Sequence, residues 1–552
     1  MLFDEGAAQE IFEVAMNDVT TVTPEFPEVD VDTLQRWLAA PDEIAFVDIR
    51  EDGVHGEGHP LLAITIPYSR LEARFPKFVP RPGTRIVLIA DPETAAKAVG
   101  YLNALGYSDV WVLSGGVEAW SAAGEILFAS NNVPSKAFAE YVEHIYHTPD
   151  IESEELDRLV KSGADVVLLD SRAIEEFESF RVPGAVSAPG VEMMYRFDEL
   201  VPSPDTLVVV TCAGRTRGII GAQALINAGV PNRVAALSGG TQGWRLSGFD
   251  LDRTPVSVAD TSPLAEPAKE SAAQRGQAVA KRFGVSVIDS ATLKQWRDDP
   301  SRTTFIFDVR TPREYARGHL EGSLGLEGGM LVQCIDRSVG TRGARLVLVD
   351  DDGVRATLTA HWLLQLGWEA VVLPGLIEGV APPSAFEKLN DWPRVREITA
   401  TQALSLLENN AVLVSADLSA DYRITHPASA VWVNRSRLHQ LPATIHDSES
   451  VIVTGKDRDL AHAVARDLSD SGLNAVVLLG DKEVWESAGL EVVSSPDFPP
   501  DEQRIDYLFW LHDRHSGNNT SSRAYLDWEL SLPAAIDATA VTGYRIPLPL
   551  QQ

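Results

Sequence analysis

The sequence predicts an α/β chain made of four tandem copies of one unit, each a mainly parallel sheet flanked by helices. Short, continuous apolar runs recur along the chain, as in strands that are buried on both faces of a parallel sheet. Three landmarks recur in the same order and at nearly constant spacing. Strand, helix and strand in repetition indicate right-handed βαβ crossovers and therefore α/β domains.

The first landmark is an apolar run that ends in Asp and is followed by a polar turn. It occupies residues 44–48, 166–170 and 305–308, with a weaker copy at 412–417. The second landmark is an apolar run that enters a short loop, and the third is a run that ends in glycine. They lie at residues 86–91, 207–212, 346–350 and 451–455, and at 113–116, 237–240, 373–375 and 478–480.

The segments between the second and third landmarks are expected to be helices. One runs from residue 93 to 105 and ends at Gly106, and another runs from 219 to 228 and ends at Gly229. Glycine commonly ends a helix because it adopts the left-handed conformation without steric cost. A further helix is expected at 135–147, between the first two copies.

Changes in composition suggest the domain boundaries. We expect domain 1 at 1–130, domain 2 at 131–250, an exposed linker at 251–277, domain 3 at 278–385, domain 4 at 386–497 and a helical tail at 498–552. The linker is rich in Pro, Ser, Ala and Glu, which is typical of exposed connections. The tail carries Tyr507, Phe509, Trp510, Tyr525 and Trp528, which predicts helices docked on a neighbouring domain.

Composition excludes several classes of protein. The 79 acidic residues exceed the 47 basic ones, and the net charge of −32 argues against a nucleic-acid or anionic-membrane partner. Two cysteines cannot form a disulfide framework or a four-thiolate zinc site. No basic residue precedes Arg36, so no secretory or transit signal is readable, and no apolar run spans a bilayer. We expect a cytoplasmic protein.

One of the four loops carries a reactive side chain. It reads Cys212, Ala213, Gly214, Arg215, Thr216, Arg217 and Gly218. A strand that meets a helix N-terminus offers free N–H groups and a favourable helix dipole for an anion. We expect these amides and the two guanidinium groups to hold a thiolate with a pKa well below the ordinary value of about 8.5. The same ring would hold a persulfide anion.

The clearest motif runs from Asp308 to Ser323, with Asp-Val-Arg, Glu-Tyr and Gly-His-Leu-Glu-Gly-Ser in order. Related stretches include Asp48-Ile49-Arg50 with Gly58-His59-Pro60, Asp170-Ser171-Arg172 with Val182-Pro183-Gly184-Ala185, and Ser-Gly-Gly segments that end at Trp120 and Trp244. These motifs resemble those of the rhodanese (sulfurtransferase) family, strongly in domains 1 to 3 and weakly in domain 4. The resemblance implies the rhodanese α/β fold and sulfur transfer through a persulfide on the loop cysteine, here Cys212.

Loop length distinguishes the two reactions that the resemblance implies, sulfur transfer and the reaction of related phosphatases. Related phosphatases have five residues between Cys and Arg, whereas four separate Cys212 from Arg217. The shorter ring fits sulfur better than phosphate, so we prefer sulfur transfer. Thiosulfate and a low-molecular-weight persulfide remain open as donors, with a thiol, cyanide or protein acceptor. The two arginines of the loop disfavour a 3-mercaptopyruvate enzyme.

The other three loops lack the cysteine. Asp91, Asp350 and Gly455 occupy its position, and a carboxylate cannot accept a sulfane sulfur. Asp91 followed by Pro92 is typical of a helix N-cap. Domains 1, 3 and 4 are therefore expected to be inactive, with domain 1 covering domain 2 as in two-domain relatives. Cys334 lies outside the loop pattern and is expected to be structural.

Two further basic residues are candidates to orient an anionic donor. They are Arg172 and Arg196, although a hydrogen bond within the fold and a solvated charge explain them as well. No cofactor and no metal are expected, since His512 and His515 have no evident third ligand. The competing function is a non-catalytic scaffold or sulfur sensor, which the three loops without cysteine favour and the intact loop disfavours.

Overall fold

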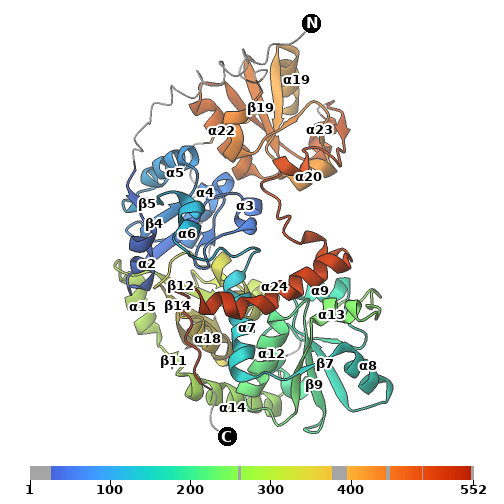
Figure 1. The fold of residues 1–552 in the computed structure, drawn as a ribbon. Helices are drawn as coiled ribbons and strands as arrows, with labels where there is room; N and C mark the ends of the chain where they lie inside the picture. The colour runs from blue at the N-terminus through green and yellow to red at the C-terminus, as the bar shows by residue number, and fades with distance from the viewer. Residues whose placement is uncertain are drawn as a thin grey trace.

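The computed structural model describes residues 26–258, 263–375, 394–442, 445, 448–487 and 489–548. Four α/β units follow one another along the chain, and a C-terminal helix returns to pack among them (Figure 1). The prediction of tandem α/β units with mainly parallel sheets and a helical C-terminal region is confirmed.

Unit 1 is a five-stranded sheet with strand order β1-β5-β4-β2-β3, and every pairing is parallel. Its elements are β1 (Glu28–Val29), α2 (Val31–Ala39), β2 (Ile44–Asp48), α3 (Asp52–Glu57), β3 (Ile64–Thr65), η1 (Tyr68–Arg70), α4 (Leu71–Phe78), β4 (Arg85–Ile89), α5 (Pro92–Ala104), β5 (Val110–Leu113) and α6 (Gly116–Ala122). The predicted helix at 93–105 is α5, and Gly106 follows it with a φ of 92°.

Unit 2 repeats this order as β6-β10-β9-β7-β8 and is preceded by α7 (Val133–Tyr146). Its elements are β6 (Asp150–Ile151), α8 (Ser153–Lys161), β7 (Val166–Asp170), α9 (Ile174–Ser179), β8 (Val186–Ser187), α10 (Glu192–Tyr195), α11 (Phe197–Leu200), β9 (Leu207–Thr211), α12 (Thr216–Asn227), β10 (Val234–Leu237) and α13 (Gly240–Leu246). Helix α12 begins three residues before the predicted start at 219, directly after the loop of Cys212.

Unit 3 has strand order β11-β15-β14-β12-β13. Its elements are α14 (Glu266–Phe283), β11 (Ser286–Val287), α15 (Ser290–Asp298), β12 (Thr304–Asp308), α16 (Pro312–Arg317), β13 (Leu324–Gly325), α17 (Gly328–Gln333), η2 (Ile335–Arg337), β14 (Arg345–Asp350), α18 (Val354–Gln365) and β15 (Glu369–Pro374).

The expected exposed linker at 251–277 is in part a helix. Its second half belongs to α14, which buries Ala272, Gly276 and Val279 and packs on α18. These small apolar residues recur at spacings of four and three, so they share one face of a helix. The overall composition of the segment does not indicate this apolar face, because Glu, Lys and Gln surround its three residues.

Unit 4 is smaller, with a four-stranded sheet of order β18-β16-β19-β20 and a separate antiparallel pair, β17 with β21. Its elements are α19 (Ala400–Glu408), β16 (Ala411–Ser415), α20 (Ser419–Ile424), β17 (His426–Pro427), β18 (Val431–Trp432), η4 (Arg435–Gln440), β19 (Ser450–Gly455), α22 (Arg458–Asp470), β20 (Ala475–Leu479), α23 (Lys482–Ser487) and β21 (Val492–Val493). The tail then forms η5 (Asp501–Gln503), η6 (His512–His515) and α24 (Asn519–Asp537).

The hydrophobic cores show which units belong together. One continuous cluster of buried residues includes Phe138 of α7, Val210 of unit 2 and Leu348 of unit 3. A second cluster combines one face of unit 1 with Leu532 and Ile536 of α24. Units 2 and 3 therefore share a core, and the tail is packed into the body of the protein rather than attached to its surface.

The Asp that ends the first landmark has the same partner in three units. Arg50, Arg172 and Arg310 each lie two residues after that Asp and bind its carboxylate. Each also donates a hydrogen bond to a carbonyl oxygen eight residues further on, at 2.6–2.8 Å. Because units without a cysteine keep this pair, it belongs to the fold.

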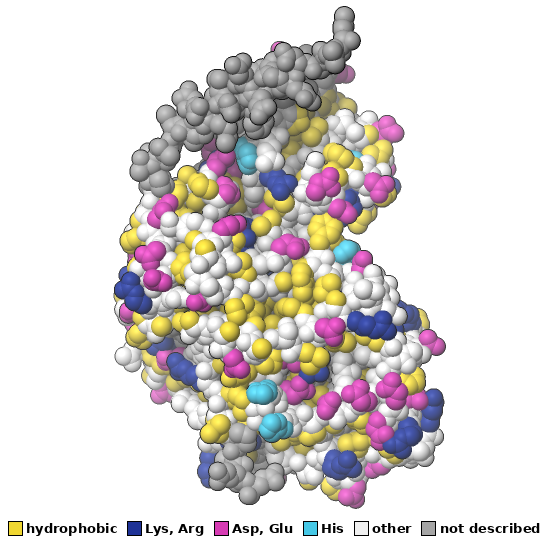
Figure 2. Space-filling view, in the orientation of Figure 1, with side chains coloured by type: hydrophobic (Ala, Val, Ile, Leu, Met, Phe, Trp, Pro, Cys, Tyr) yellow, Lys and Arg dark blue, Asp and Glu magenta, His cyan; other side chains and the backbone are white. Residues whose placement is uncertain are grey.

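Acidic side chains are spread across the face of the molecule drawn in Figure 2, in agreement with the net charge of −32. Within the described residues, no helix combines the length and the apolar character that a membrane span requires.

Candidate active site

The loop of Cys212 connects the carboxyl end of β9 to the first turn of α12. Cys212 is 2% exposed, and its Sγ lies 3.6 Å from the position that a Cβ on Gly218 would take. The backbone N–H groups of Gly214 and Gly218 interact with the sulfur and stabilise its ionised form. These two N–H groups lie at the N-terminal end of α12, where the helix dipole also favours an anion.

The glycine-rich turn after β10 holds the outer side of this loop. The backbone N–H groups of Thr241 and Gln242 donate to the carbonyl oxygens of Cys212 and Ala213, at 2.8 and 3.1 Å. Because the carbonyl oxygens are bound outside, the loop N–H groups turn inward. This contact explains why the Ser-Gly-Gly landmark follows the loop in the sequence.

Gly240 is the position in this turn that tolerates a side chain least. A Cβ there would lie 2.4 Å from the carbonyl oxygen of Cys212 and 2.5 Å from that of Gly214, and φ is 56°. We expect Gly240→Ala to displace the loop, with a loss of about 1–3 kcal/mol in stability and about tenfold in turnover. Thermal unfolding and sulfur-transfer kinetics measure both.

Gly229→Ala is the matched control for Gly240→Ala. Gly229 has a φ of 73°, but a Cβ there would meet nothing within 4 Å. In Gly229→Ala only the left-handed backbone conformation then lowers the free energy of unfolding, by about 1 kcal/mol. We expect turnover to stay at the wild-type value. Equal turnover in the two variants would contradict the role given to the turn.

The two arginines of the loop are engaged by carboxylates. Arg215 turns toward α7, where its Nε donates to Glu140 at 2.9 Å and its terminal nitrogen binds Glu143. Arg217 forms a two-pronged pair with Glu176 of α9, at 2.6 and 2.9 Å. Neither guanidinium is available to an anionic donor in this arrangement.

The expectation of a thiolate with a lowered pKa is wrong for this closed site. Burial raises the pKa of Cys212 to about 11, and the charge of Glu529 acts in the same direction. Arg217 and the N–H groups of Gly214 and Gly218 lower the pKa by less. The loop sequence shows the arginines but not the carboxylates that neutralise them, which is why it suggested an ionised thiol.

Helix α24 covers the site. Glu529 is 1% exposed, and its Oε1 accepts hydrogen bonds from Thr216 of the loop at 3.1 Å and from Tyr525 at 2.9 Å. A Cβ on Gly214 would lie 3.2 Å from the Tyr525 ring. The expected cover of domain 2 by domain 1 is thus replaced by a helix from the opposite end of the chain (Figure 1).

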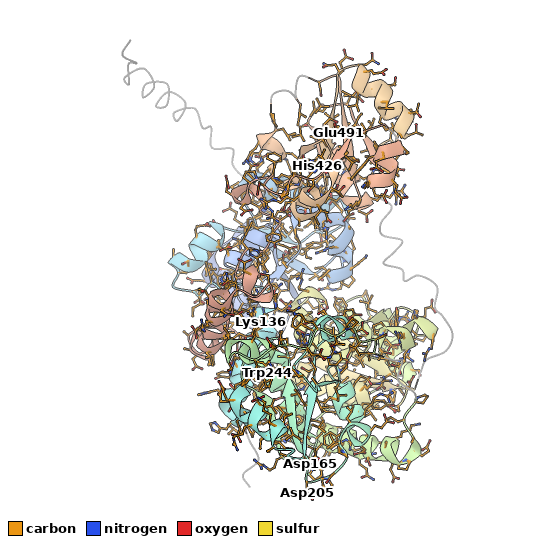
Figure 3. The ribbon with its side chains drawn as sticks, turned by 90° about the vertical axis from the view of Figure 1, so that its right-hand side faces the viewer. Lys136, Asp165, Asp205, Trp244, His426 and Glu491 are labelled. Carbon is orange, nitrogen blue, oxygen red and sulfur yellow. The ribbon has the colours of Figure 1, made fainter. Side chains whose placement is uncertain are left out.

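Lys136 of α7 is buried below α24, and Figure 3 labels it next to that helix. Its Nζ donates to Ser130 and to the carbonyl oxygen of Asn131, and lies 5.4 Å from the centre of the Tyr525 ring. Burial lowers the pKa of Lys136 to about 8 and raises that of Glu140 to about 7. The pKa values of these two buried groups near the loop are thus both shifted toward neutrality.

A family model for rhodanese-like domains matches residues 30–123, 152–247 and 289–381. The chain belongs to the rhodanese-like family. Each matched segment begins just after the first strand of units 1, 2 and 3 and contains the other four strands of that sheet.

One solved structure extends this comparison over nearly the whole chain. The crystal structure of a thiosulfate sulfurtransferase from Pseudomonas aeruginosa is 39% identical, covers 94% of this chain and 99% of that chain, and has a TM-score of 0.86. A Bacillus halodurans protein is 22% identical and covers 22% of this chain and 87% of that one, with a TM-score of 0.18, too low to bear on the fold. No curated protein matches the chain.

Arg172 and Arg196 do not serve the rhodanese-like loop as expected. Arg172 is fully buried and binds Asp170, the pair that units 1 and 3 repeat. Arg196 binds Glu192 and Glu199 beside it on the chain. Both arginines are used within the fold, so the role of orienting a donor does not fit either of them.

The pair of Arg217 with Glu176 also recurs where no cysteine is present. In unit 3, Arg355 stands five residues after Asp350, as Arg217 does after Cys212, and it binds Glu314 at 2.9 Å. Because the same ion pair is present in a loop that lacks the thiol, we infer that Arg217 stabilises the loop and does not bind the substrate.

Two of the three loops without a cysteine are closed by their own aspartate. Asp91 caps α5 by accepting from the N–H groups of Glu93 and Thr94, as predicted. Asp350 directs its carboxylate into its own loop, where it accepts from the N–H groups of Gly353 and Ala356. A carboxylate thus occupies the anion position of unit 3, whereas unit 4 has Gly455 there.

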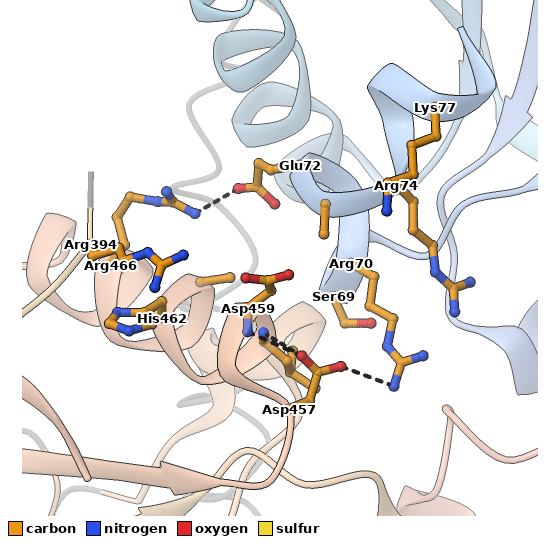
Figure 4. A pocket seen from close by; sticks show the side chains of 13 residues that line it. Ser69, Arg70, Glu72, Arg74, Lys77, Arg394, Asp457, Asp459, His462 and Arg466 are labelled. Atoms are coloured by element: carbon orange, nitrogen blue, oxygen red, sulfur yellow. Dashed lines mark hydrogen bonds and ion pairs between the residues drawn. The ribbon is translucent and has the colours of Figure 1, made fainter. Parts of the chain in front are cut away.

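Cavities lie between units, and two of them separate unit 1 from unit 4 and unit 2 from unit 3. One of about 260 Å³ separates η1 and α4 from the start of α22, and ion pairs join Arg70 to Asp457 and Glu72 to Arg466 across it (Figure 4). Another, of about 40 Å³, lies between units 2 and 3 beside the first turns of α12. Neither is lined by a thiol of the described residues.

Sequence reasoning missed the groups that α7, α13 and α24 bring to the site. These residues are Lys136, Glu140, Gln242, Tyr525 and Glu529. Lys136 and Glu140 stand four residues apart in the predicted helix, which places them on one face. Tyr525 was recognised only as an anchor for the tail, and nothing in the sequence connects Glu529 with the loop.

Proposed function

We propose that the chain is a sulfurtransferase that carries sulfane sulfur on Cys212, with thiosulfate or a low-molecular-weight persulfide as the donor. The single observation that carries this proposal is the position of Cys212, with its sulfur beside the backbone N–H groups of Gly214 and Gly218 at the start of α12. The likeness over nearly the full length to a thiosulfate sulfurtransferase supports the reaction class and favours thiosulfate.

The chemistry proceeds in two halves. The Cys212 thiolate attacks the outer sulfur of the donor, and the donor leaves as sulfite or as a thiolate. A thiol, cyanide or protein acceptor then attacks the outer sulfur of the persulfide and regenerates the thiolate. The amides of the loop stabilise the negative sulfur in both halves, as an oxyanion hole stabilises oxygen.

We assign this reaction to residues 131–250 and give the units at 1–130, 278–385 and 386–497 a role in packing. The loops of these units carry Asp91, Asp350 and Gly455, none of which can bind sulfur covalently. Both cysteines of the chain are free thiols. A reducing, cytoplasmic compartment keeps such thiols available.

Sulfur loading tests the proposal directly. We expect incubation with thiosulfate to add the mass of one sulfur atom to the intact chain, on the peptide that contains Cys212. Cyanide should then remove this sulfur as thiocyanate. Mass spectrometry follows both steps, and the peptide with Cys334 is the internal reference. Loading at Cys334 alone, or no mass gain at all, contradicts the proposal.

A further inference from the structure

The carboxylate of Glu529 directs one oxygen toward the loop of Cys212. Oε1 is bound by Thr216 and Tyr525, whereas Oε2 has no partner among the described residues. Oε2 lies 3.0 Å from the position of a Cβ on Gly214. A buried carboxylate oxygen without a partner is costly, so its direction toward the loop indicates a function.

A second buried polar group converges on the same point. Gln242 of α13 is 5% exposed, and neither its amide nitrogen nor its amide oxygen has a partner within the described residues. The nitrogen lies 3.6 Å from the same Cβ position on Gly214. The unpartnered Oε2 of Glu529 on α24 and the unpartnered amide of Gln242 on α13 thus meet at the loop of Cys212.

Cys212 needs a group that accepts its proton. Its pKa of about 11 keeps the thiol neutral at pH 7, and the charge of Glu529 contributes to that value. Three other nearby carboxylates, Glu140, Glu143 and Glu176, are bound to Arg215 or Arg217. Glu529 is the carboxylate at the loop with no arginine partner in the described part of the chain.

We propose that Glu529 accepts the proton of Cys212 when the thiolate forms and holds it while the sulfur carries the negative charge. This inference rests on the proposed function. Burial raises the pKa of Glu529, which makes it a better base than an ordinary carboxylate. Proton transfer moves one negative charge from oxygen to sulfur, so the net charge of the buried site does not change.

The steps balance without any further reactant. The S–H bond of Cys212 breaks, and its proton forms the O–H bond of the Glu529 carboxylic acid. The thiolate forms an S–S bond with the outer sulfur of thiosulfate while the bond to the inner sulfur breaks, and sulfite leaves with that electron pair. After cyanide takes the outer sulfur, the Cys212 thiolate recovers the proton from Glu529.

Charged and titratable groups from each packed element face Glu529. They are Lys136 and Glu140 of α7, Arg215 before α12, Tyr525 of α24 and Cys212 itself, while Arg514 of η6 acts on Tyr525. Below the raised pKa of Glu529, both acids are protonated and no thiolate forms. The loading rate therefore rises with pH through the pKa of Glu529 and then levels off.

The test compares single-turnover sulfur loading by thiosulfate in wild type, Glu529→Gln and Asp527→Asn. At about pH 7 we expect Glu529→Gln to load about 100-fold more slowly, because glutamine cannot accept a proton. Its rate should keep rising about tenfold per pH unit, where the wild type has levelled off. Asp527 is exposed on the same helix, so Asp527→Asn should match the wild type.

Tyr525→Phe is a second, conservative variant that tests the role of Glu529. Tyr525 donates to the Glu529 carboxylate at 2.9 Å, and this bond stabilises the ionised form. Its loss should raise the pKa of Glu529, which moves the rising limb of the pH profile to higher pH and leaves the plateau within about twofold. A purely structural role for Tyr525 would lower the plateau without moving the limb.

The outcomes separate the two proposals. Near-UV circular dichroism confirms that each variant is folded before the rates are compared. If the wild type and Glu529→Gln load equally fast at pH 7, or the variant loads faster, the proton role is wrong and the proposed function stands. If the wild type takes up no sulfur at any pH, both fail.

Discussion

Replacement of Cys212 by serine is expected to abolish sulfur transfer. A serine hydroxyl has neither the nucleophilicity toward sulfur nor the acidity of a thiol, and no persulfide can form on it. We expect thiocyanate formation from thiosulfate and cyanide to fall by at least about 10³-fold, which corresponds to about 4 kcal/mol of transition-state stabilisation. A colorimetric thiocyanate assay measures the loss.

Cys334→Ser is the matched control for that experiment. Cys334 is half-buried at the end of α17 and outside the loop, so its replacement should leave turnover unchanged. The same thiol-to-hydroxyl change is thus made at both positions. Retention of activity in the Cys212 variant, or loss in the Cys334 variant, would rule out Cys212 as the sulfur carrier.

Loss of Arg435 is expected to have the largest effect on stability. Its guanidinium is fully buried between units 1 and 4, where it binds Glu72 at 2.5 and 2.7 Å and Asp467 at 2.9 Å. Arg435→Met leaves two carboxylates buried without this partner. Removing one member of a buried ionic network costs about 3–5 kcal/mol, so unit 4 should unfold or detach first in urea.

Hydrogen exchange during a urea titration localises that effect. Amides of residues 450–479 should lose protection at a lower urea concentration in Arg435→Met, while those of units 2 and 3 keep theirs. Arg458→Met is the control, since Arg458 pairs with Glu397 within unit 4 at an exposed position, worth less than about 1 kcal/mol. Equal protection in the two variants would show that Arg435 does not hold the units together.

Much of the fold could be predicted because the relevant signals are local. The apolar runs at 44–48 and 166–170 are strands with the same bounds in the structure, since a fully buried parallel strand needs a continuous apolar segment. The helix after Cys212 and its end before Gly229 follow from glycine placement. The helix within the expected linker was missed because its apolar face is narrow.

The candidate site was predictable only where its residues are neighbours in sequence. Cys212 and the backbone N–H groups of its loop all lie within residues 212–218. The low acidity of the thiol comes from its burial and from the charge of Glu529 on α24, while Glu140 of α7 and Glu176 of α9 pair with the two arginines of the loop. No periodicity or spacing in the sequence records which carboxylate will meet which arginine.

The position of α24 late in the sequence has a consequence for how the protein is made. Thr216 and Glu529 touch in the finished molecule, but 313 residues separate them along the chain. At a synthesis rate of about 10 residues per second, the ribosome completes α24 roughly half a minute after the cysteine loop. The nascent polypeptide therefore emerges with its thiol uncovered, and α24, which is translated much later, seals it from cellular oxidants.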